Sequence, residues 1–334
     1  MSLEPAGAEA VRGDGAALGR RLRAGDVSAA PATLNLLEST RPADRAEAAA
    51  LLHEVSPEQL GGEAPGHVLG VTGPPGAGKS TLLSALLHAW RARDQSVAML
   101  AVDPASRRSG GSLLGDRARI DFDPGDRDVF IRSTSAADRL GGLAPATRIA
   151  SGALAAAFDI VVIETVGVGQ AETEVVEVAD TVAVVVQPGS GDALQFLKSG
   201  IMEIPDVLVV TKSDLGQVAL RARRDLAAAL RSLGSDTRVT AVSSLPPTQG
   251  IDELVAALDA HRAGLDLPAR RLAARRSSAI TEFTVEHGER GVRALGGRRA
   301  VQRWLAEQPA GLEVPRLVAA LEARVRDRAT AETT

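Results

Sequence analysis

The chain of 334 residues has a formal net charge of −4, contains no cysteine and has only 2% aromatic residues. Its length is sufficient for one large domain with helical additions or for two domains. The absence of cysteine excludes disulfides, thiolate nucleophiles and metal sites built on cysteine. The nearly balanced charge and the scarcity of aromatic rings disfavour nucleic-acid binding, which relies on basic surfaces and base stacking.

The N-terminus and the histidines limit the possible functions further. The first ten residues lack a basic segment followed by an apolar one, and no apolar run reaches the roughly 18 residues of a membrane helix. We therefore expect a cytoplasmic protein without a membrane partner. No two histidines lie at metal-ligand spacing, so we expect each to be a surface or packing residue. They are His53, His67, His88, His261 and His287.

Residues 1–60 are predicted to form an N-terminal helical segment, because leucines recur at helical spacing from Ala16 to about Leu60. Ser28 is a candidate helix cap. Pro42 fits the first turn of a helix, where its missing N–H is not needed. The glycine-rich residues 61–66 indicate a linker to the next unit.

The most informative stretch is Gly73–Thr81, which reads Gly-Pro-Pro-Gly-Ala-Gly-Lys-Ser-Thr between an apolar run and a helical one. This spacing is typical of a phosphate-binding loop, because glycine permits the backbone angles that turn successive amides toward a polyphosphate. We expect Lys79 to reach the β and γ phosphates and Ser80 to bind Mg²⁺. The candidate nucleotide contacts are Gly73, Pro74, Pro75, Gly76, Ala77, Gly78, Lys79, Ser80 and Thr81.

Short apolar runs alternate with helical stretches through residues 61–264, the predicted nucleotide domain. Most are continuously apolar, which is typical of strands buried on both faces of a mostly parallel sheet. The sequence therefore predicts an α/β fold, a P-loop NTPase with a doubly wound sheet and helical extensions at both ends. The predicted strands are Val97–Val102, Val129–Arg132, Ile160–Glu164, Thr181–Val186, Val207–Thr211 and Val239–Ser243, and the predicted crossover helices are Arg221–Leu233 and Ile251–Arg262.

Acidic residues follow two of these strands, at the sheet edge where such folds bind ligands. Asp103 and Glu164 each end a strand, and their carboxylates are oxygen ligands suited to Mg²⁺. The Gly167 N–H is placed to sense the γ-phosphate, and Asp116 lies in a loop that could close over the phosphates. The alternative for each acid is a cap on a helix or a loop.

The run Thr211-Lys212-Ser213-Asp214 follows another strand and predicts a guanine site. An aspartate there can accept two hydrogen bonds from the N1–H and N2–H₂ groups of guanine, while the Lys212 stem lies over the ring. Adenine offers no such pair of donors, so GTP and GDP are favoured over adenine nucleotides. Ser243 and Ser244, after the last predicted strand, predict a backbone loop in contact with the base.

Residues 265–334 are predicted to form a C-terminal helical extension. Leu272, Ile280 and Phe283 lie on one helical stripe, and Val314 to Arg326 contains another. Such stripes suit a dimer contact and suit packing within the chain equally well. The arginines of this region are predicted to form a solvated helix face. They are Arg270, Arg271, Arg275 and Arg276.

Three longer motifs resemble the MeaB/ArgK family of methylmalonyl-CoA mutase-associated GTPases, the relatives of the human MMAA protein. They lie at residues 101–116, 164–170 and 188–195, and the similarity runs from about residue 15 to residue 264. The resemblance implies a GTP-hydrolysing chaperone that gates adenosylcobalamin loading, protection or reactivation of a B12-dependent acyl-CoA mutase. It also implies a homodimer formed through the C-terminal helices.

By this resemblance, residues 189–198 form a mobile loop that relays the nucleotide state to the mutase. Thr211 stands where the family usually has asparagine. Differences at Ala193, Phe196 and Ser199 leave the identity of the client mutase open. The residues that match the family's active site are Lys79 and Ser80 for phosphate and magnesium, Asp103, Asp116 and Glu164 for the acidic positions, and Lys212 and Asp214 for guanine.

Alternative functions stay open at this stage. No residue is an evident catalytic base, although Gln170 is a candidate for orienting water and Arg108 for stabilising charge. A small-molecule kinase would require an acceptor pocket and a preference for ATP. A metal-insertion GTPase, such as one that inserts nickel, would require cysteine or histidine ligands near the switch loops. A binding module with a purely structural nucleotide would retain intact GTP.

Overall fold

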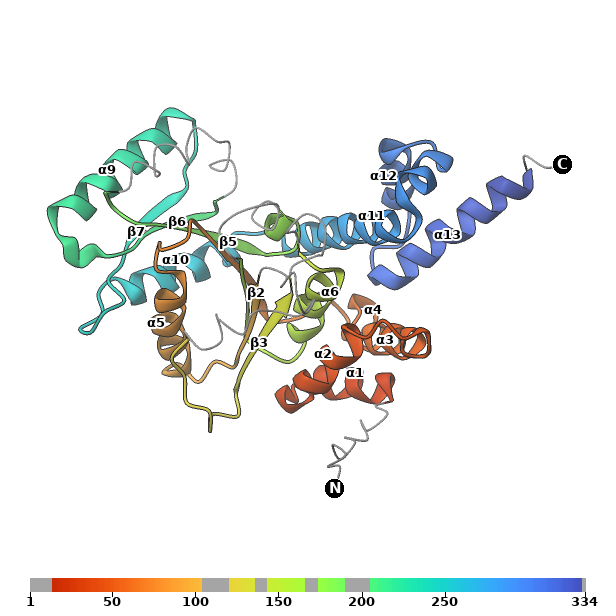
Figure 1. Ribbon diagram of the computed structural model, residues 1–334, viewed down its shortest axis with the longest axis horizontal. Helices are drawn as coiled ribbons and strands as arrows, with labels where there is room; N and C mark the ends of the chain where they lie inside the picture. The colour runs from red at the N-terminus through yellow and green to blue at the C-terminus, as the bar shows by residue number, and fades with distance from the viewer. Residues whose placement is uncertain (1–13, 104–119, 136–142, 166–173, 190–204, 332–334) are drawn as a thin grey trace, which may run out of the picture.

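The computed structural model describes residues 14–103, 120–135, 143–165, 174–189 and 205–331. Its centre is a seven-stranded sheet in the order β3-β2-β4-β1-β5-β6-β7, in which every neighbouring pair is parallel (Figure 1). The predicted doubly wound α/β fold is thus confirmed. The strands are β1 (His67–Thr72), β2 (Val97–Asp103), β3 (Val129–Ser135), β4 (Ile160–Glu164), β5 (Thr181–Val186), β6 (Val207–Val210) and β7 (Arg238–Ala241).

Helices cover both faces of this sheet, which explains why its central strands are apolar at successive positions. On one face, Leu83 of α5 (Lys79–Arg91) and Leu254 of α10 (Ile251–Ala263) share a buried core with β1 and β4. On the other face, α6 (Pro145–Leu154) and α9 (Gln217–Ser232) contribute to a second core. No helix among the described residues is both long and apolar enough to cross a membrane.

The N-terminal helices belong to the second core, where Leu22, Leu34 and Leu51 are buried. Pro42 occupies the first turn of α3, as predicted. The prediction that Ser28 caps a helix is wrong, because the Asp26 carboxylate accepts the Ser28 backbone N–H and takes that role. The elements are α1 (Gly15–Arg23), η1 (Val27–Ala29), α2 (Ala30–Leu37), α3 (Pro42–Glu54) and α4 (Pro57–Leu60).

The C-terminal region forms a third core from α11 (Leu267–Ala294), α12 (Arg298–Ala306) and α13 (Val314–Ala331). Ile280 and Phe283 of α11 are buried in the same cluster as Leu317 and Leu321 of α13. Apart from the half-buried Leu272, the predicted apolar stripes are therefore covered within one chain. The helix α12, which the sequence pattern did not predict, contributes Val301 and Leu305 to this core.

The prediction of a solvated arginine face on α11 is wrong. Arg271 is only 8% exposed and makes two hydrogen bonds to the Asp180 carboxylate, of 2.9 and 2.6 Å, besides donating to the carbonyls of Ala64 and Gly66. Arg275, one helical turn later, makes a bidentate pair with Glu63 at 2.8 and 2.9 Å. The spacing of four residues places both arginines on the helix face that meets the linker.

The other two arginines of that run also have partners in the fold. Arg270 lies 3.2 Å from the Asp206 carboxylate, and Arg276 donates to the Ala306 carbonyl at 3.0 Å. Together the four side chains fasten α11 to the linker, the sheet and α12. They therefore fix the C-terminal helices against the nucleotide domain.

Two histidines lie in a polar chain at the start of β1 and β5. His67 Nε2 is 2.7 Å from Thr181 Oγ1, which is 2.9 Å from His261 Nδ1. His261 Nε2 lies 3.3 Å from the Asp206 carboxylate. His67 is only 2% exposed, and burial lowers the pKa of its imidazole to about 4. Both histidines are thus packing residues, as predicted.

This lowered pKa predicts that the protein loses stability in mild acid. The unfolded chain takes up a proton at His67 below about pH 6.5, whereas the folded chain does so only near pH 4. The contribution of His67 to the free energy of unfolding should therefore be fully present above pH 6.5. It should fall by about 3 kcal/mol as the pH decreases to 4. Urea unfolding midpoints measured from pH 7 to pH 4 should decrease less steeply for His67→Gln than for wild type. The exposed His88→Gln variant should follow wild type, and equal slopes for all three would refute the assignment.

Candidate nucleotide-binding site

The predicted phosphate loop connects β1 to α5, at the carboxyl edge of the sheet. Gly73, Gly76 and Gly78 have φ values of +144°, +78° and +89°, in the region that favours glycine. A Cβ atom on Gly73 would lie 2.0 Å from the Val185 carbonyl oxygen, so the loop also needs glycine there to approach β5. The glycines of this segment therefore permit the observed loop conformation.

A Gly73→Ala substitution should weaken GTP binding by at least about tenfold, equal to about 1.4 kcal/mol, because the new methyl group forces the loop away from β5. Isothermal titration calorimetry with GTP would measure the change. Gly152→Ala in α6 is the matched control, since nothing lies within 4 Å of its added methyl. Wild-type affinity in the Gly73→Ala variant would contradict the inferred role of this contact.

Lys79 lies folded into the phosphate loop. Its Nζ donates to the carbonyl oxygens of Gly73, at 2.7 Å, and Pro74, at 3.3 Å, and the residue is only 8% exposed. The ammonium group is thus held at the inner side of the loop, beside the backbone amides at the start of α5. Positive charge and a helix N-terminus at one place favour an anion.

Ser80 and Glu164 meet beside this loop, although they lie far apart in the sequence. Ser80 Oγ donates to Glu164 Oε1 at 3.1 Å. Glu164 ends β4 and pairs in register with Val71 of β1, which brings the 4% exposed side chain next to the first turn of α5. A hydroxyl and a carboxylate oxygen in contact are a donor set that Mg²⁺ prefers. These two residues fit the predicted ion.

The predicted guanine segment follows β6 and supports the phosphate loop from the other side. Thr211 Oγ1 lies 2.6 Å from the Ala77 carbonyl and 3.1 Å from that of Val186. The Thr211 hydroxyl therefore bridges the loop to β5. Lys212 has a φ of +55°, and its Nζ donates to the Gly76 carbonyl at 3.3 Å and to the Gln187 side chain.

Asp214 and Ser243 lie together at the ends of β6 and β7. Ser243 Oγ donates to Asp214 Oδ1 at 3.1 Å, and the backbone of Ser243 exchanges two hydrogen bonds with Gln249. Asp214 is exposed, whereas Ser243 is buried and Ser244 is half-buried. The exposed carboxylate is accessible to a base that enters from solvent.

The remaining predicted site residues divide into two groups. Asp103 is the last residue of β2, and Ala101, two positions earlier, pairs with Glu164, so the backbone of Asp103 reaches the same sheet edge. The others lie outside the described residues. They are Arg108, Asp116, Gly167, Gln170 and residues 190–198.

Three polar residues of this edge were not predicted. Thr165 Oγ1 donates to Thr72 Oγ1 at 2.8 Å, which joins the ends of β1 and β4 behind the phosphate loop. Gln187 holds Lys212 from the end of β5. All three lie at or directly after a strand end, so the rule that identified Asp103 and Glu164 would have found them.

Comparison with known proteins gives one family. The family model described as methylmalonyl Co-A mutase-associated GTPase MeaB matches residues 30–292. Over 195 residues the chain is 45% identical to a protein of Pyrococcus horikoshii named as a GTPase, covering 58% of this chain and 59% of that protein. Over 215 residues it is 37% identical to the mitochondrial methylmalonic aciduria type A homolog of Caenorhabditis elegans, covering 61% of this chain and 53% of that one.

The similarity extends to a solved structure. The crystal structure of an LAO/AO transport system kinase superposes with a TM-score of 0.63 and 30% identity, covering 92% of this chain and 99% of that one. The matches to the curated relatives span about three fifths or less of those proteins' length.

Proposed function

Because the chain belongs to the MeaB family of methylmalonyl-CoA mutase-associated GTPases, we propose that it hydrolyses GTP to GDP and phosphate and uses this cycle as a chaperone of an adenosylcobalamin-dependent acyl-CoA mutase. One observation supports the proposal that the chain binds GTP. The Ser80–Glu164 contact and the Asp214–Ser243 contact lie at the same edge of one parallel sheet, on either side of the phosphate loop. This edge is where doubly wound sheets bind nucleotides.

In the proposed complex, the loop amides and Lys79 bind the phosphates, and Asp214 with the Lys212 stem binds guanine. Ser80, Glu164 and Asp103 would hold Mg²⁺, which supplies charge neutralisation at the β and γ phosphates. Thr211 keeps its role in supporting the loop from behind, since its hydroxyl is engaged by backbone carbonyls. In the same proposal, the Gly167 N–H senses the γ-phosphate, and Asp116 belongs to a loop that closes over the phosphates.

Hydrolysis by the isolated chain should be slow. Catalysis of phosphoryl transfer rests on orienting water and on stabilising charge that develops on the phosphate. None of the described residues beside the phosphate loop is an evident general base, and no arginine there points to the loop. A partner that supplies these groups should accelerate hydrolysis by up to about 10³- to 10⁵-fold.

The chaperone role rests on segments that follow the strands of the nucleotide edge. Loss of the γ-phosphate changes the contacts of such segments, and a partner bound to them senses the change. The partner is an acyl-CoA mutase, and the client's acyl group is left open. The homodimer and the cytoplasmic location belong to the same proposal. Since the C-terminal stripes are covered within the chain, a dimer would use other surfaces, and light scattering of the purified protein measures its mass.

The decisive experiment reconstitutes the protein with candidate mutases and measures transfer of adenosylcobalamin to the apo-mutase. With GTP, transfer should proceed. A non-hydrolysable GTP analogue should prevent transfer without dissociating the complex between the protein and the mutase. ATP should support neither binding nor transfer. Cofactor transfer at the same rate with GTP, the analogue and no nucleotide would refute the chaperone role. Equal affinity for ATP and GTP in calorimetry would favour a small-molecule kinase instead.

A further inference from the structure

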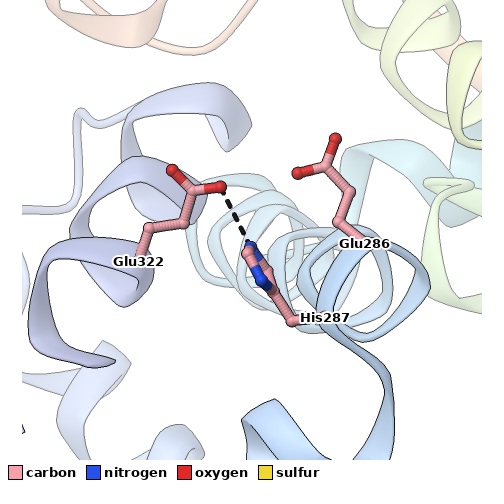
Figure 2. A group of neighbouring side chains, drawn as sticks. All are labelled: Glu286, His287 and Glu322. Atoms are coloured by element: carbon pink, nitrogen blue, oxygen red, sulfur yellow. Dashed lines mark hydrogen bonds and ion pairs between the residues drawn. The ribbon is translucent and has the colours of Figure 1, made fainter. Parts of the chain in front are cut away.

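A second group of ionisable side chains lies on the C-terminal helices, away from the phosphate loop. Glu286 and His287 of α11 and Glu322 of α13 turn their polar atoms toward one another (Figure 2). One ligand atom from each lies within 4.8 Å of the others, and His287 Nε2 is 3.1 Å from Glu322 Oε1. The group joins two helices 35 residues apart in the sequence.

The imidazole of His287 is held in place by its surroundings. Its ring packs on the Phe283 ring with centroids 4.7 Å apart, and Phe283 is fully buried. The next residue, Gly288, has φ +63° and interrupts the helix. Gly291 lacks a side chain where a Cβ would lie 2.6 Å from the His287 Cβ. A ring positioned in this way loses little further freedom when it binds a ligand.

A third carboxyl group, that of Glu282, lies near this place. Glu282 lies one helical turn before Glu286, and its buried Oε2 has no hydrogen-bond partner among the described residues. Burial, and then the charge of Glu286, raise the pKa of Glu282 to about 7. Arg45 of α3 contributes a positive charge 3.5 Å from Glu286, and its side chain is 71% exposed. The carboxylates of Glu286 and Glu322 thus lie close together beside Glu282, and a bound cation would offset the repulsion between their charges.

We propose that Glu286, His287 and Glu322 bind a divalent first-row transition-metal ion of the Zn²⁺ type, which links α11 to α13. One imidazole nitrogen and carboxylate oxygens are ligands that Zn²⁺ and Co²⁺ accept, whereas Mg²⁺ prefers oxygen alone. Glu286 and His287 are exposed, so water can complete the coordination. The site is separate from the Mg²⁺ position proposed at Ser80.

The test uses the full chain without nucleotide and Co²⁺ as a spectroscopic substitute for Zn²⁺. Equilibrium dialysis and visible absorption should show about one Co²⁺ per chain, displaced by Zn²⁺. His287→Asn and Glu322→Gln should each weaken binding by at least about tenfold, since loss even of an outer-shell partner can cost that much. Glu289→Gln, which alters an exposed carboxylate on the same helix outside the cluster, should bind as wild type does.

Two controls separate this site from others and from misfolding. Retained GTP affinity in the His287→Asn and Glu322→Gln variants shows that the nucleotide domain is folded. Zn²⁺ should raise the melting temperature of wild type and of Glu289→Gln but of neither ligand variant, because only an ion bound across α11 and α13 stabilises that contact. Absence of Co²⁺ binding at micromolar concentration, or equal binding by wild type and His287→Asn, would overturn the proposal.

Discussion

The Asp214→Asn variant is expected to bind GTP at least about 10³-fold more weakly than wild type while keeping its fold. The carboxylate accepts two N–H groups of guanine in the proposed complex, and the amide replaces one acceptor with a donor that faces them. A site built for hydrogen bonds discriminates strongly when one of them is left unmet. Calorimetric titration with GTP measures the loss directly.

The same variant should gain affinity for xanthosine triphosphate, because xanthine carries a carbonyl oxygen where guanine has its N2 amino group and the new amide can donate to it. Asp225→Asn is the matched control, because Asp225 is an exposed aspartate on α9 outside the segment Thr211–Asp214. It should bind both nucleotides as wild type does. Unchanged GTP affinity in Asp214→Asn would show that the segment after β6 does not read the base.

The Arg271→Met variant should lose about 3–5 kcal/mol of folding free energy, because it leaves the Asp180 carboxylate buried and without its cation. Asp180 is 1% exposed, and the Arg271 guanidinium also supplies the donors for the Ala64 and Gly66 carbonyls. The pair joins α11 to the residue before β5, and the two carbonyl contacts join it to the linker before β1. Urea unfolding, followed by circular dichroism, measures the loss.

Replacing Asp180 as well tests whether its unpaired buried charge causes the loss of stability. Asp180→Asn keeps an acceptor for the Val68 backbone N–H but removes the charge, so the double variant should recover part of the stability lost by Arg271→Met. Arg293→Met, an exposed arginine on the same helix, should change the unfolding midpoint little. An Arg271→Met variant as stable as wild type would show that the buried pair contributes no net stability.

Most strands could be predicted because burial on both faces imposes a local pattern. The boundaries of Ile160–Glu164 and Thr181–Val186 agree exactly with β4 and β5, where every residue is buried. At the sheet edge the pattern weakens, and β7 begins one residue earlier and ends two residues earlier than the predicted run of Val239–Ser243. The cap at Ser28 failed for a different reason, since the Asp26 carboxylate caps this turn and accepts both the backbone N–H and the hydroxyl of Ser28.

The sequence by itself determined the phosphate loop, because the conformation of Gly73–Thr81 depends on residues within one short segment. It also placed Glu164 and Asp214 at the correct edge, since parallel strands end together. Only the tertiary structure decided which charges meet. The contacts Ser80–Glu164, Asp180–Arg271 and His287–Glu322 join residues 84, 91 and 35 positions apart. No local pattern distinguishes an arginine that will be buried against a distant carboxylate from one that faces water, because the desolvation and pairing that separate them arise only when the elements pack.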